Sequence, residues 1–242
     1  MTDHVNELNQ PIGFPVPDWR PCPHPRGSIM QGSRCRLEPI DAERHAGDLF
    51  AAFSEDRDTR NWTYLPYGPF QSEQETRTWI ENTCLGDDPC FFSVIDLASQ
   101  KAVGVASYLR IDPAMGVIEV GHIHFSPLMQ GSPLSTEAMY LMMRRVFDEL
   151  GYRRYEWKCD ALNQPSCRAA ERLGFLFEGI FRQATMYRQR NRDTAWFSIL
   201  DREWPVARQA FETWLDAANF DSSGQQKARL AELMQPGLSA LR

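Results

Sequence analysis

Residues 117–159 read VIEVGHIHFSPLMQGSPLSTEAMYLMMRRVFDELGYRRYEWKC, and this stretch decides the fold. Its first part, Val117 to Phe125, is rich in β-branched residues and predicts a strand. Apolar residues then recur at helical spacing as far as Gly151, a residue type that commonly ends helices. Tyr152 to Cys159 predicts a second strand. A strand, a long helix and a strand in this order usually give parallel neighbours and a right-handed crossover.

Further strands separated by short turns are predicted outside this unit, which indicates antiparallel pairing. They are Cys35–Ile40, Cys90–Leu97, Ala102–Ile111, Glu178–Tyr187 and Thr194–Leu200. Helices are expected after Asp41 and Ser72, which have the side chains of N-caps, and from Pro165 to Leu173. The fold class that follows is α+β, with a mixed, mostly antiparallel central sheet flanked by helices.

Two flanking segments differ from this domain, which we place at residues 33–203. Residues 1–32 form a proline-rich arm, and Trp19 within it favours an arm that lies on its own domain or on a partner subunit. The arm could therefore join a homodimer. Residues 204–242 predict a helical tail packed on the domain, with one helix from Trp204 to Leu215 and a second over Lys227–Met234.

The composition limits the class of protein. Of the 242 residues 43% are hydrophobic and 24% are charged, as in ordinary globular proteins. The net charge of -6 argues against a nucleic-acid partner, because phosphate binding usually needs a basic excess. No stretch approaches the roughly 20 apolar residues that span a bilayer, and the polar Met1–Asn9 does not resemble a signal peptide. Six scattered cysteines favour reduced thiols and a cytoplasmic location.

The turn before the long helix is a candidate anion site. Gly131 can adopt backbone angles closed to other residues, Ser132 is a natural N-cap, and Pro133 is favoured at the first helical position. Free amides at such a helix start bind phosphate, although many similar turns bind nothing. The candidate residues are Gln130, Gly131, Ser132, Pro133, Leu134 and Ser135.

This loop resembles the pyrophosphate loop, Q/R-x-x-G-x-G/A, of the GCN5-related N-acetyltransferase (GNAT) superfamily. Gln130 and Ser135 match it, whereas Pro133 stands where glycine is usual. The stretch Asn163–Gly179 is also similar to the family, through its asparagine, serine, Leu-Gly-Phe and Glu-Gly residues. Thr136-Glu137-Ala138 is typical of the ribosomal-protein N-terminal acetyltransferase-like (RimJ/RimL-type) subgroup.

The resemblance implies a V-shaped splay between the fourth and fifth strands and an N-acetyltransferase. Such an enzyme moves an acetyl group from acetyl-CoA to a primary amine of a protein N-terminus, peptide or small molecule, by direct attack on the thioester. The cofactor-binding residues carried over are His124, Phe125 and Ser126 along the thioester arm, and Asn163 and Ser166 near the sulfur. Ser166 would be the proton donor or the hydrogen-bond partner of the leaving thiolate.

Two alternatives stay open beside this activity. The chain could be an acyl-CoA-binding regulatory domain without catalysis, or a transferase for a longer acyl-CoA. The first is supported by Pro133, which removes a donor amide, and by Ala170, which stands where many relatives have an acidic tyrosine.

A general base is needed because an alkylammonium must lose a proton before it attacks. The candidates are Glu119, His122 and Asp160. Strand alternation separates Glu119 from His122 and His124 unless a bulge intervenes, and Glu119 could instead be a solvated strand carboxylate. His122 and His124 lack an evident third ligand, so we expect no metal.

The acceptor wall is expected from the aromatic loop that contains Trp62, Tyr64, Tyr67 and Phe70. Aromatic side chains of this kind could bind an apolar or cationic acceptor, or could simply pack the two early helices together. The acidic balance of the whole chain favours a cationic acceptor.

Overall fold

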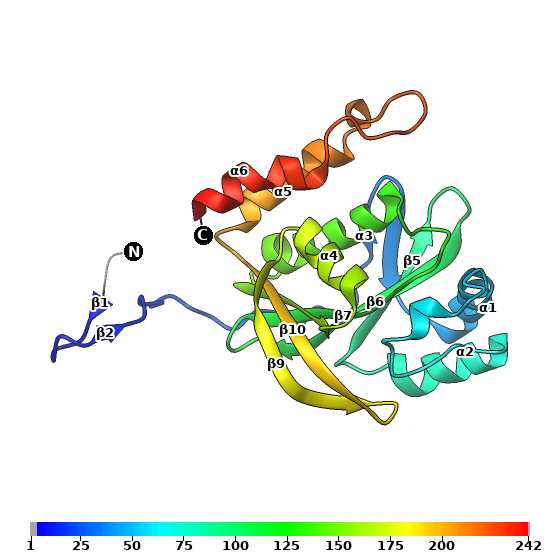
Figure 1. Cartoon of the computed structure of the whole chain (residues 1–242), viewed down its shortest axis with the longest axis horizontal. Coiled ribbons are helices and arrows are strands. Elements are labelled where there is room, and N and C mark those ends of the chain that lie inside the picture. The colour runs from blue at the N-terminus through cyan, green and yellow to red at the C-terminus, as the bar shows by residue number, and fades with distance from the viewer. Residues whose placement is uncertain (1–3, 242) are drawn as a thin grey trace.

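The computed structural model describes residues 4–241, and its elements follow the predicted order (Figure 1). The strands are β1 (His4–Val5), β2 (Pro11–Ile12), β3 (Met30–Gln31), β4 (Cys35–Pro39), β5 (Cys90–Asp96), β6 (Lys101–Asp112), β7 (Val117–Phe125), β8 (Arg154–Asp160), β9 (Leu176–Tyr187) and β10 (Arg190–Leu200). The helices are α1 (Ala42–Phe53), η1 (Arg60–Trp62), α2 (Glu73–Trp79), η2 (Ile80–Cys84), α3 (Pro133–Arg144), η3 (Arg145–Glu149), α4 (Gln164–Arg172), α5 (Trp204–Leu215), η4 (Ala217–Asn219) and α6 (Leu230–Leu241). Residues 1–3 of the predicted arm and residue 242 of the predicted tail lie outside the described range.

One sheet organises the domain. Eight strands lie in the order β3-β4-β5-β6-β7-β8-β10-β9. All neighbours are antiparallel except β7 and β8, which are parallel and joined through α3. The predicted α+β fold with a mixed, mostly antiparallel sheet is therefore confirmed.

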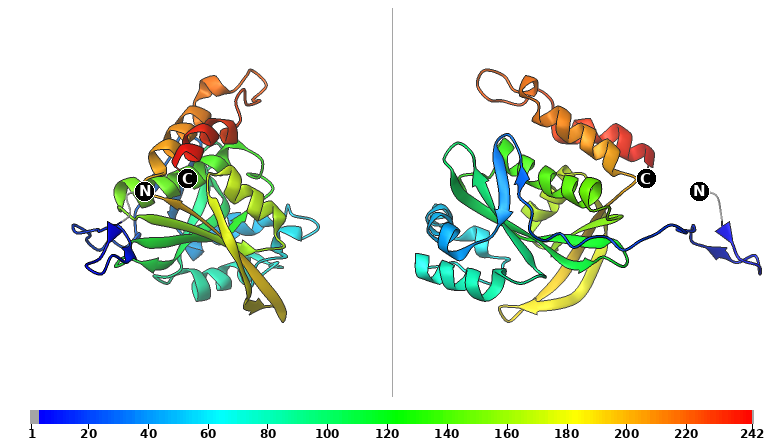
Figure 2. Two further views of the ribbon diagram at one scale, coloured as in Figure 1. Left: turned by 60° about the vertical axis from the view of Figure 1, so that its left-hand side comes forward. Right: turned by 180° about the vertical axis from the view of Figure 1, so that it is seen from behind.

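Helices cover both faces of this sheet (Figures 1 and 2). On one face α1 and α2 bury a core that includes Leu49, Trp79 and Val105. On the other face α3 and α5 bury a larger core that includes Met139 and Phe211. Because both faces are covered, the central strands carry apolar side chains on both sides.

The geometry of two helix starts matches the sequence signals. The Asp41 side chain accepts a hydrogen bond from the Arg44 amide at 2.8 Å, and the Ser72 hydroxyl accepts one from the Glu75 amide at 3.1 Å. Each cap satisfies one of the amides that a helix start leaves unpaired. The predicted N-caps of α1 and α2 are confirmed.

Glu137 on α3 fastens the turn between β3 and β4. Its buried carboxylate accepts hydrogen bonds from the amides of Ser33, Arg34 and Cys35 at 2.7–3.1 Å. Burial alone raises the pKa of Glu137, but these hydrogen bonds outweigh it and hold the pKa below its ordinary value. These hydrogen bonds join the turn between β3 and β4 to the start of α3.

The N-terminal arm has two parts. Residues 4–16, expected to be irregular, contain the short β1–β2 hairpin, which stands away from the domain (Figure 1). The docked part begins at Trp19, whose indole donates to the Ala114 carbonyl at 2.6 Å. Its ring lies against Gly116, where a Cβ would meet it at 2.2 Å. The Cys22 amide continues the docking by donating to the Pro113 carbonyl at 2.9 Å.

The C-terminal helices lie on the α3 side of the sheet, as Figure 1 shows for α5 and α6. The second of them was expected over Lys227–Met234, but it runs from Leu230 to Leu241. Leu230, Met234 and Leu238 form a buried stripe, and this burial outweighs the helix-breaking sequence that follows Gln235. No helix within residues 4–241 is long and apolar enough to cross a membrane.

Candidate active site

The parallel pair β7 and β8 separates at its carboxyl ends. Their ladder runs from Val117 opposite Arg154 to Val120 opposite Trp157 and stops there. Both strands continue, β7 to Phe125 and β8 to Asp160. The backbone groups of β7 and β8 that face each other beyond the last pair are therefore free to bind an extended ligand between the strands. This is the position at which the family resemblance predicts the splay.

A β-bulge at His122 changes the faces of β7. Ser107 of β6 lies opposite Gly121, but Val105 lies opposite His124, so two residues of β7 face one of β6. His122 has a φ of 49°, in the left-handed region. Glu119, His122 and His124 consequently lie on the same α1–α2 face, so simple alternation was the wrong expectation here.

His122 occupies an aromatic pocket on this face. Its Nδ1 lies 3.2 Å from the Tyr67 hydroxyl, and its ring lies 5.0 Å from the Phe91 ring. Burial lowers the pKa of His122 to about 4, helped by the positive charges of Arg110 and Arg192. The imidazole is therefore neutral near pH 7. Its Nε2 makes no hydrogen bond within residues 4–241, and it can accept a proton in the tautomer in which Nδ1 carries the ring hydrogen and donates it to the Tyr67 oxygen.

His124 has a different environment. Its ring, 3% exposed, lies between Phe53 and Trp62, with centroid distances of 4.3 and 3.8 Å. Burial lowers its pKa to about 3, and its Nε2 has no hydrogen-bond partner in the described part of the chain. The side chain packs α1 onto the sheet, which leaves only its backbone facing the splay.

Glu119 is engaged by two cations. Its carboxylate lies 2.7 Å from Arg110 Nη1 and 2.9 Å from Lys158 Nζ, and the second contact is an ion pair without hydrogen-bond alignment. Lys158 also lies 2.7 Å from Glu156 and 3.7 Å from the centre of the Trp196 ring. Burial raises the pKa of Glu119 and the two cations oppose this. Since Glu119 is only 2% exposed, it is not the solvated strand carboxylate considered above.

The residues after β8 form a second wall of the splay. The Trp157 indole donates to Ser166 Oγ at 3.0 Å, so the hydroxyl keeps its own proton for another acceptor. Asn163 caps α4 by accepting from the Ser166 amide at 3.2 Å. The Asp160 carboxylate accepts from the Tyr187 hydroxyl at 2.9 Å and from the Leu162 amide at 2.9 Å.

The anion loop has open amides. Gly131 has a φ of 66°, as its residue type predicts. Ser132 stands at the N-cap position of α3, as predicted, but its side chain makes no capping hydrogen bond, because its hydroxyl donates to the Met129 carbonyl at 2.7 Å. Within the described residues no hydrogen bond occupies the amides of Gly131 and Ser132. The first-turn amides of Leu134 and Ser135 also lack helical acceptors.

The neighbouring residues hold the loop in shape. Gln130 Nε2 donates to the Phe125 carbonyl at 2.7 Å, and Ser135 Oγ donates to the Ser132 carbonyl at 2.8 Å. Ser126 is fully buried, and its carbonyl accepts hydrogen bonds from the Met129 and Gln130 amides at 3.0 and 3.1 Å. These contacts preorganise the turn between β7 and α3.

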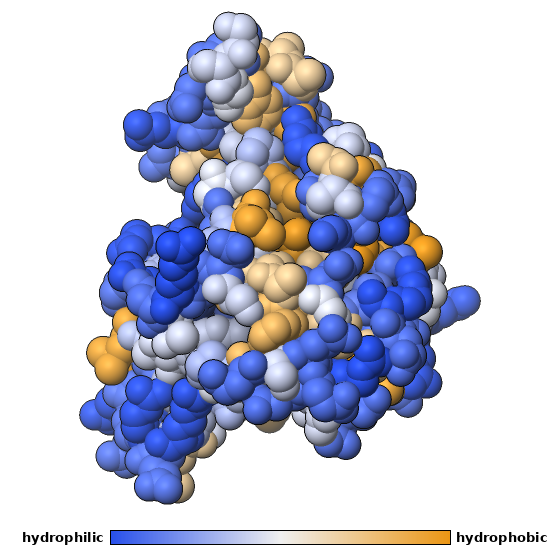
Figure 3. Space-filling model, turned by 90° about the vertical axis from the view of Figure 1, so that its right-hand side faces the viewer, coloured by the Kyte–Doolittle hydropathy of each residue, from blue (hydrophilic) through white to orange (hydrophobic). Residues whose placement is uncertain are grey.

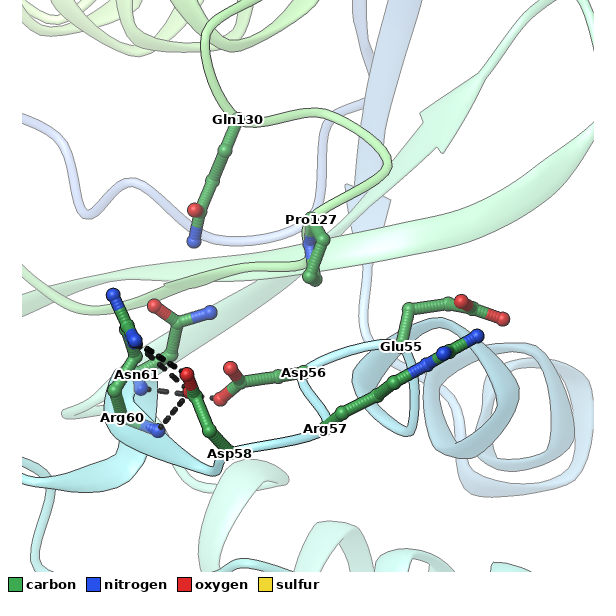
Figure 4. Close-up of a pocket in the computed structure, with 8 residues that line it drawn as sticks. All are labelled: Glu55, Asp56, Arg57, Asp58, Arg60, Asn61, Pro127 and Gln130. Atoms are coloured by element: carbon green, nitrogen blue, oxygen red, sulfur yellow. Dashed lines mark hydrogen bonds and ion pairs between the residues drawn. The ribbon is translucent and has the colours of Figure 1, made fainter.

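A pocket of about 380 Å³ lies beside this loop (Figure 4). Gln130 and Pro127 line it from the loop, and the segment between α1 and η1 lines it from the other side. The lining residues on that side are Glu55, Asp56, Arg57 and Asp58 of the segment and Arg60 and Asn61 of η1. The sequence analysis missed these residues, because nothing in a polar loop after α1 indicates what it faces.

The aromatic loop divides into packing and lining residues. Trp62 is 3% exposed and packs with Phe70 at a ring distance of 5.2 Å. Tyr67 is half-buried, and the Tyr64 hydroxyl donates to the Leu162 carbonyl at 3.1 Å. Figure 3 shows the side of the molecule that carries α1 and α2, where apolar residues gather in the middle between hydrophilic regions.

The β9–β10 hairpin reaches this loop, and the sequence analysis missed it. Arg188 Nη2 donates to the Tyr67 carbonyl at 2.6 Å and also to the Gly68 carbonyl. Arg190 Nη2 donates to the Thr63 carbonyl at 2.7 Å. Among the described residues no group of three or more histidine, cysteine or carboxylate side chains is placed to hold a metal ion.

The comparisons with known proteins define the class of protein. Residues 34–176 match the family described as "Acetyltransferase (GNAT) domain". The chain belongs to this family and is an N-acetyltransferase; the family uses acetyl-CoA. A GCN5-related N-acetyltransferase from Brucella melitensis is 50% identical, covers 90% of this chain and 99% of its own, and superposes with a TM-score of 0.88.

Two further proteins are similar to this chain. A probable acetyltransferase of the GNAT family from Chromobacterium violaceum is 41% identical, covers 81% of this chain and 98% of its own, and has a TM-score of 0.75. The ribosomal-protein-serine acetyltransferase of Escherichia coli is 24% identical over 148 residues, which is 59% of this chain and 80% of that protein. The Thr136-Glu137-Ala138 run, which resembles the RimJ/RimL-type subgroup, agrees with this last similarity.

Proposed function

We propose that this protein transfers an acetyl group from acetyl-CoA to a primary amine by direct attack on the thioester. The acceptor amine is that of a protein N-terminus, a peptide or a small molecule. The observation that carries the proposal is the neutral His122, held by Tyr67 on the edge of a splay whose other wall presents Ser166.

The cofactor side of the proposal uses backbone groups. The unpaired ends of β7 and β8 offer amides and carbonyls to the pantetheine arm, and His124, Phe125 and Ser126 contribute theirs. The pyrophosphate is expected on the open amides of the loop Gln130–Ser135. Asn163 contributes by holding the start of α4.

The chemical step needs three roles. His122 Nε2 removes a proton from the ammonium, directly or through a water, and the neutral amine attacks the thioester carbonyl carbon. A β7 amide at the splay stabilises the oxyanion. The C–S bond then breaks as the nitrogen loses its second proton to solvent. The thiolate takes a proton from the Ser166 hydroxyl, which solvent reprotonates, or from solvent directly. The products are an N-acetyl amide and free CoA.

The other candidate bases are less suited to this step. Glu119 is held by Arg110 and Lys158, and Asp160 is held by Tyr187. Each would have to leave its partners before it could accept a proton. We therefore assign Glu119 to the positioning of Lys158, and Asp160 to the positioning of Tyr187.

The experiment is a screen of amines and peptides with acetyl-CoA and thiol detection of released CoA, alongside calorimetric titration of acetyl-CoA. We expect micromolar to sub-millimolar binding and amine-dependent CoA release. Binding without release would favour the regulatory-domain alternative, and faster release from a longer acyl-CoA would favour that donor. Undetectable binding at millimolar acetyl-CoA would contradict the proposal.

We also propose that the arm joins two copies of the chain. Residues 4–16 make no hydrogen bond to their own domain, and five of their apolar side chains are exposed. These side chains are Val5, Leu8, Ile12, Phe14 and Val16. Docking from Trp19 onward fixes the direction in which they project. A second copy offers a complementary surface in β9, a free edge strand with exposed Phe177, Ile180 and Phe181.

A further inference from the structure

The tip of the β9–β10 hairpin carries a local positive charge in an acidic chain. Residues 187–193 contain Arg188, Arg190 and Arg192 and a single aspartate, a net charge of +2 in a chain of net charge -6. The Asp193 carboxylate accepts hydrogen bonds from the Gln183 amide and the Asn191 side chain instead of pairing with an arginine.

Arg192 lies on the face of the sheet that carries the active site. Its Nε donates to Thr194 Oγ1 at 3.2 Å, so the two side chains lie together. Thr194 is opposite Asp160 of β8, and the next pair on that face, Trp196 and Lys158, is in direct contact. Lys158 in turn contacts Glu119 on the α1–α2 face. Arg192 therefore points to the same side as His122.

Arg192 is also close to the groups of the splay. Its charge is one of two that lower the pKa of His122, and it also acts on Cys159 and on Tyr187. These three residues come from β7, β8 and β9, so the guanidinium lies near the point where the strands diverge.

Arg192 differs from the other cations of this region in having neither a carboxylate nor a backbone carbonyl as partner within the described residues. Arg110 and Lys158 form ion pairs with Glu119. Arg188 and Arg190 donate to backbone carbonyls of the aromatic loop. Arg192, half-buried, has only the Thr194 hydroxyl within the described residues. A half-buried guanidinium retains unused donors in a fork that matches a carboxylate.

We propose that Arg192 binds a carboxylate of the acceptor, so that the acceptor is an amine with a carboxylate a few bonds away. The inference rests on the proposed function and names its substrate class. The carboxylate could be the α-carboxylate of a free amino acid or the acidic side chain at the second position of a peptide. Arg192 is a specificity residue in either case, and His122 remains the base.

The test compares acceptors that differ only in this group. Methionine and phenylalanine are each paired with their carboxamides, and a peptide that begins Ser-Asp is paired with one that begins Ser-Asn. We expect the wild-type kcat/KM for the better carboxylate acceptor to exceed that of its amide at least tenfold. Which pair shows the preference identifies the source of the carboxylate.

The variants separate binding from folding. Arg192→Gln should remove the preference by raising KM for the carboxylate acceptor more than KM for its amide, while Arg192→Lys should restore part of the preference. The control Arg182→Gln, on the same hairpin, should keep the preference. Equal losses for acid and amide in Arg192→Gln would overturn the inference, as would a wild-type enzyme that prefers the amide.

A binding measurement keeps this test independent of turnover. N-acetylmethionine should raise the melting temperature of the wild-type protein more than N-acetylmethioninamide does, and the equivalent products of the peptide pair serve in the same way. The difference should vanish in Arg192→Gln. Absence of any difference in the wild type for all the pairs would overturn the inference. Absence of CoA release with every amine would instead contradict the proposed function.

Discussion

The Tyr67 hydroxyl lies 3.2 Å from Nδ1 of His122, and the two rings stack with an interplanar angle of 13°. The contact joins the aromatic loop to the bulge of β7, which are 55 residues apart in the chain. With the ring hydrogen on Nδ1 and donated to the Tyr67 oxygen, Nε2 is the nitrogen left for proton transfer, because a hydrogen bond at one imidazole nitrogen sets the role of the other.

This contact predicts the effect of substitutions at both residues. His122→Ala should lower kcat about a hundredfold or more, the usual contribution of a positioned base. Tyr67→Phe should lower it about tenfold, because the ring stays but loses its orientation. Steady-state CoA release measures both. Wild-type activity in His122→Ala would remove the residue from the mechanism.

The low pKa of His122 predicts the pH dependence. Because the group titrates at about 4, it is already a competent base below neutrality. The pH profile of kcat/KM should therefore lack an inflection near 6.5, the ordinary histidine value. Any rise at alkaline pH should follow the acceptor and shift when an amine of different pKa is used. An inflection near 6.5 that disappears in His122→Gln would contradict the environment described here.

Ser166 supplies a third prediction. Since the Trp157 indole donates to its oxygen, the hydroxyl proton is available to the leaving thiolate. Ser166→Ala should lower kcat about tenfold and leave KM for the amine unchanged, since a thiolate is a fair leaving group without help. Trp157→Phe, which removes the indole donor, should cause a smaller loss. Full activity of Ser166→Ala would exclude the proton-donor role.

Pro133 allows a test of the anion loop. Proline has no N–H, so Pro133→Ala adds one amide among those that face the proposed pyrophosphate. We expect the Kd of acetyl-CoA to fall about threefold, as one neutral hydrogen bond usually allows. The matched Gly131→Ala, at a φ of 66°, should weaken binding because alanine is strained there. Calorimetry that shows no change in either variant would place the pyrophosphate elsewhere.

His124 should make stability depend on pH. Its pKa is lowered to about 3 in the folded state, so the unfolded chain binds more protons between about pH 3 and 6.5. As the pH is lowered through this window, the unfolding free energy therefore decreases, by about 2 kcal/mol at pH 5 for one such group. His124→Phe should remove this loss in urea unfolding, whereas the exposed control His24→Gln should not. Parallel pH curves for wild type and His124→Phe would show that the ring is protonated in the folded protein.

The arm gives a prediction about assembly. Removal of residues 1–16 should convert a dimer to a monomer in light scattering, because the exposed apolar side chains lie in that segment. Phe14→Ser is the matched point variant. Removal should leave the melting temperature of the domain near that of the wild type at low protein concentration, since docking to the domain begins at Trp19. An unchanged mass for the truncated chain would mean that the arm has no role between copies.

Local patterns in the sequence predict the elements well. The strand–helix–strand unit, the caps at Asp41 and Ser72 and the mixed sheet all follow from periodicity and side-chain chemistry over a few residues. These features depend on neighbours in the chain, which the sequence displays directly.

The ion pairs and hydrogen bonds of each site residue involve partners that are distant in the chain, and local sequence patterns do not predict them. The ion pairs of Glu119 come from β6 and β8, and the free guanidinium of Arg192 results from a hairpin far along the chain. The acidic balance of the whole chain favours a cationic acceptor, whereas Arg192, close to the splay, has no carboxylate partner within the described residues. Net charge describes the average surface and not one cleft.

The bulge at His122 acts as a phase shift in β7. Up to Gly121 the strand follows one alternation, and from Ile123 onward it follows the opposite one. In a relative without this extra residue, the residue at the same count along β7 as His124 would face α3, and the residue at the count of Phe125 would face α1. A sequence alignment without a gap at the bulge would therefore pair residues that face opposite sides of the sheet. The error would extend over the half of the strand where the thioester is expected. Roles carried between family members along β7 hold only where the bulge is present in both chains.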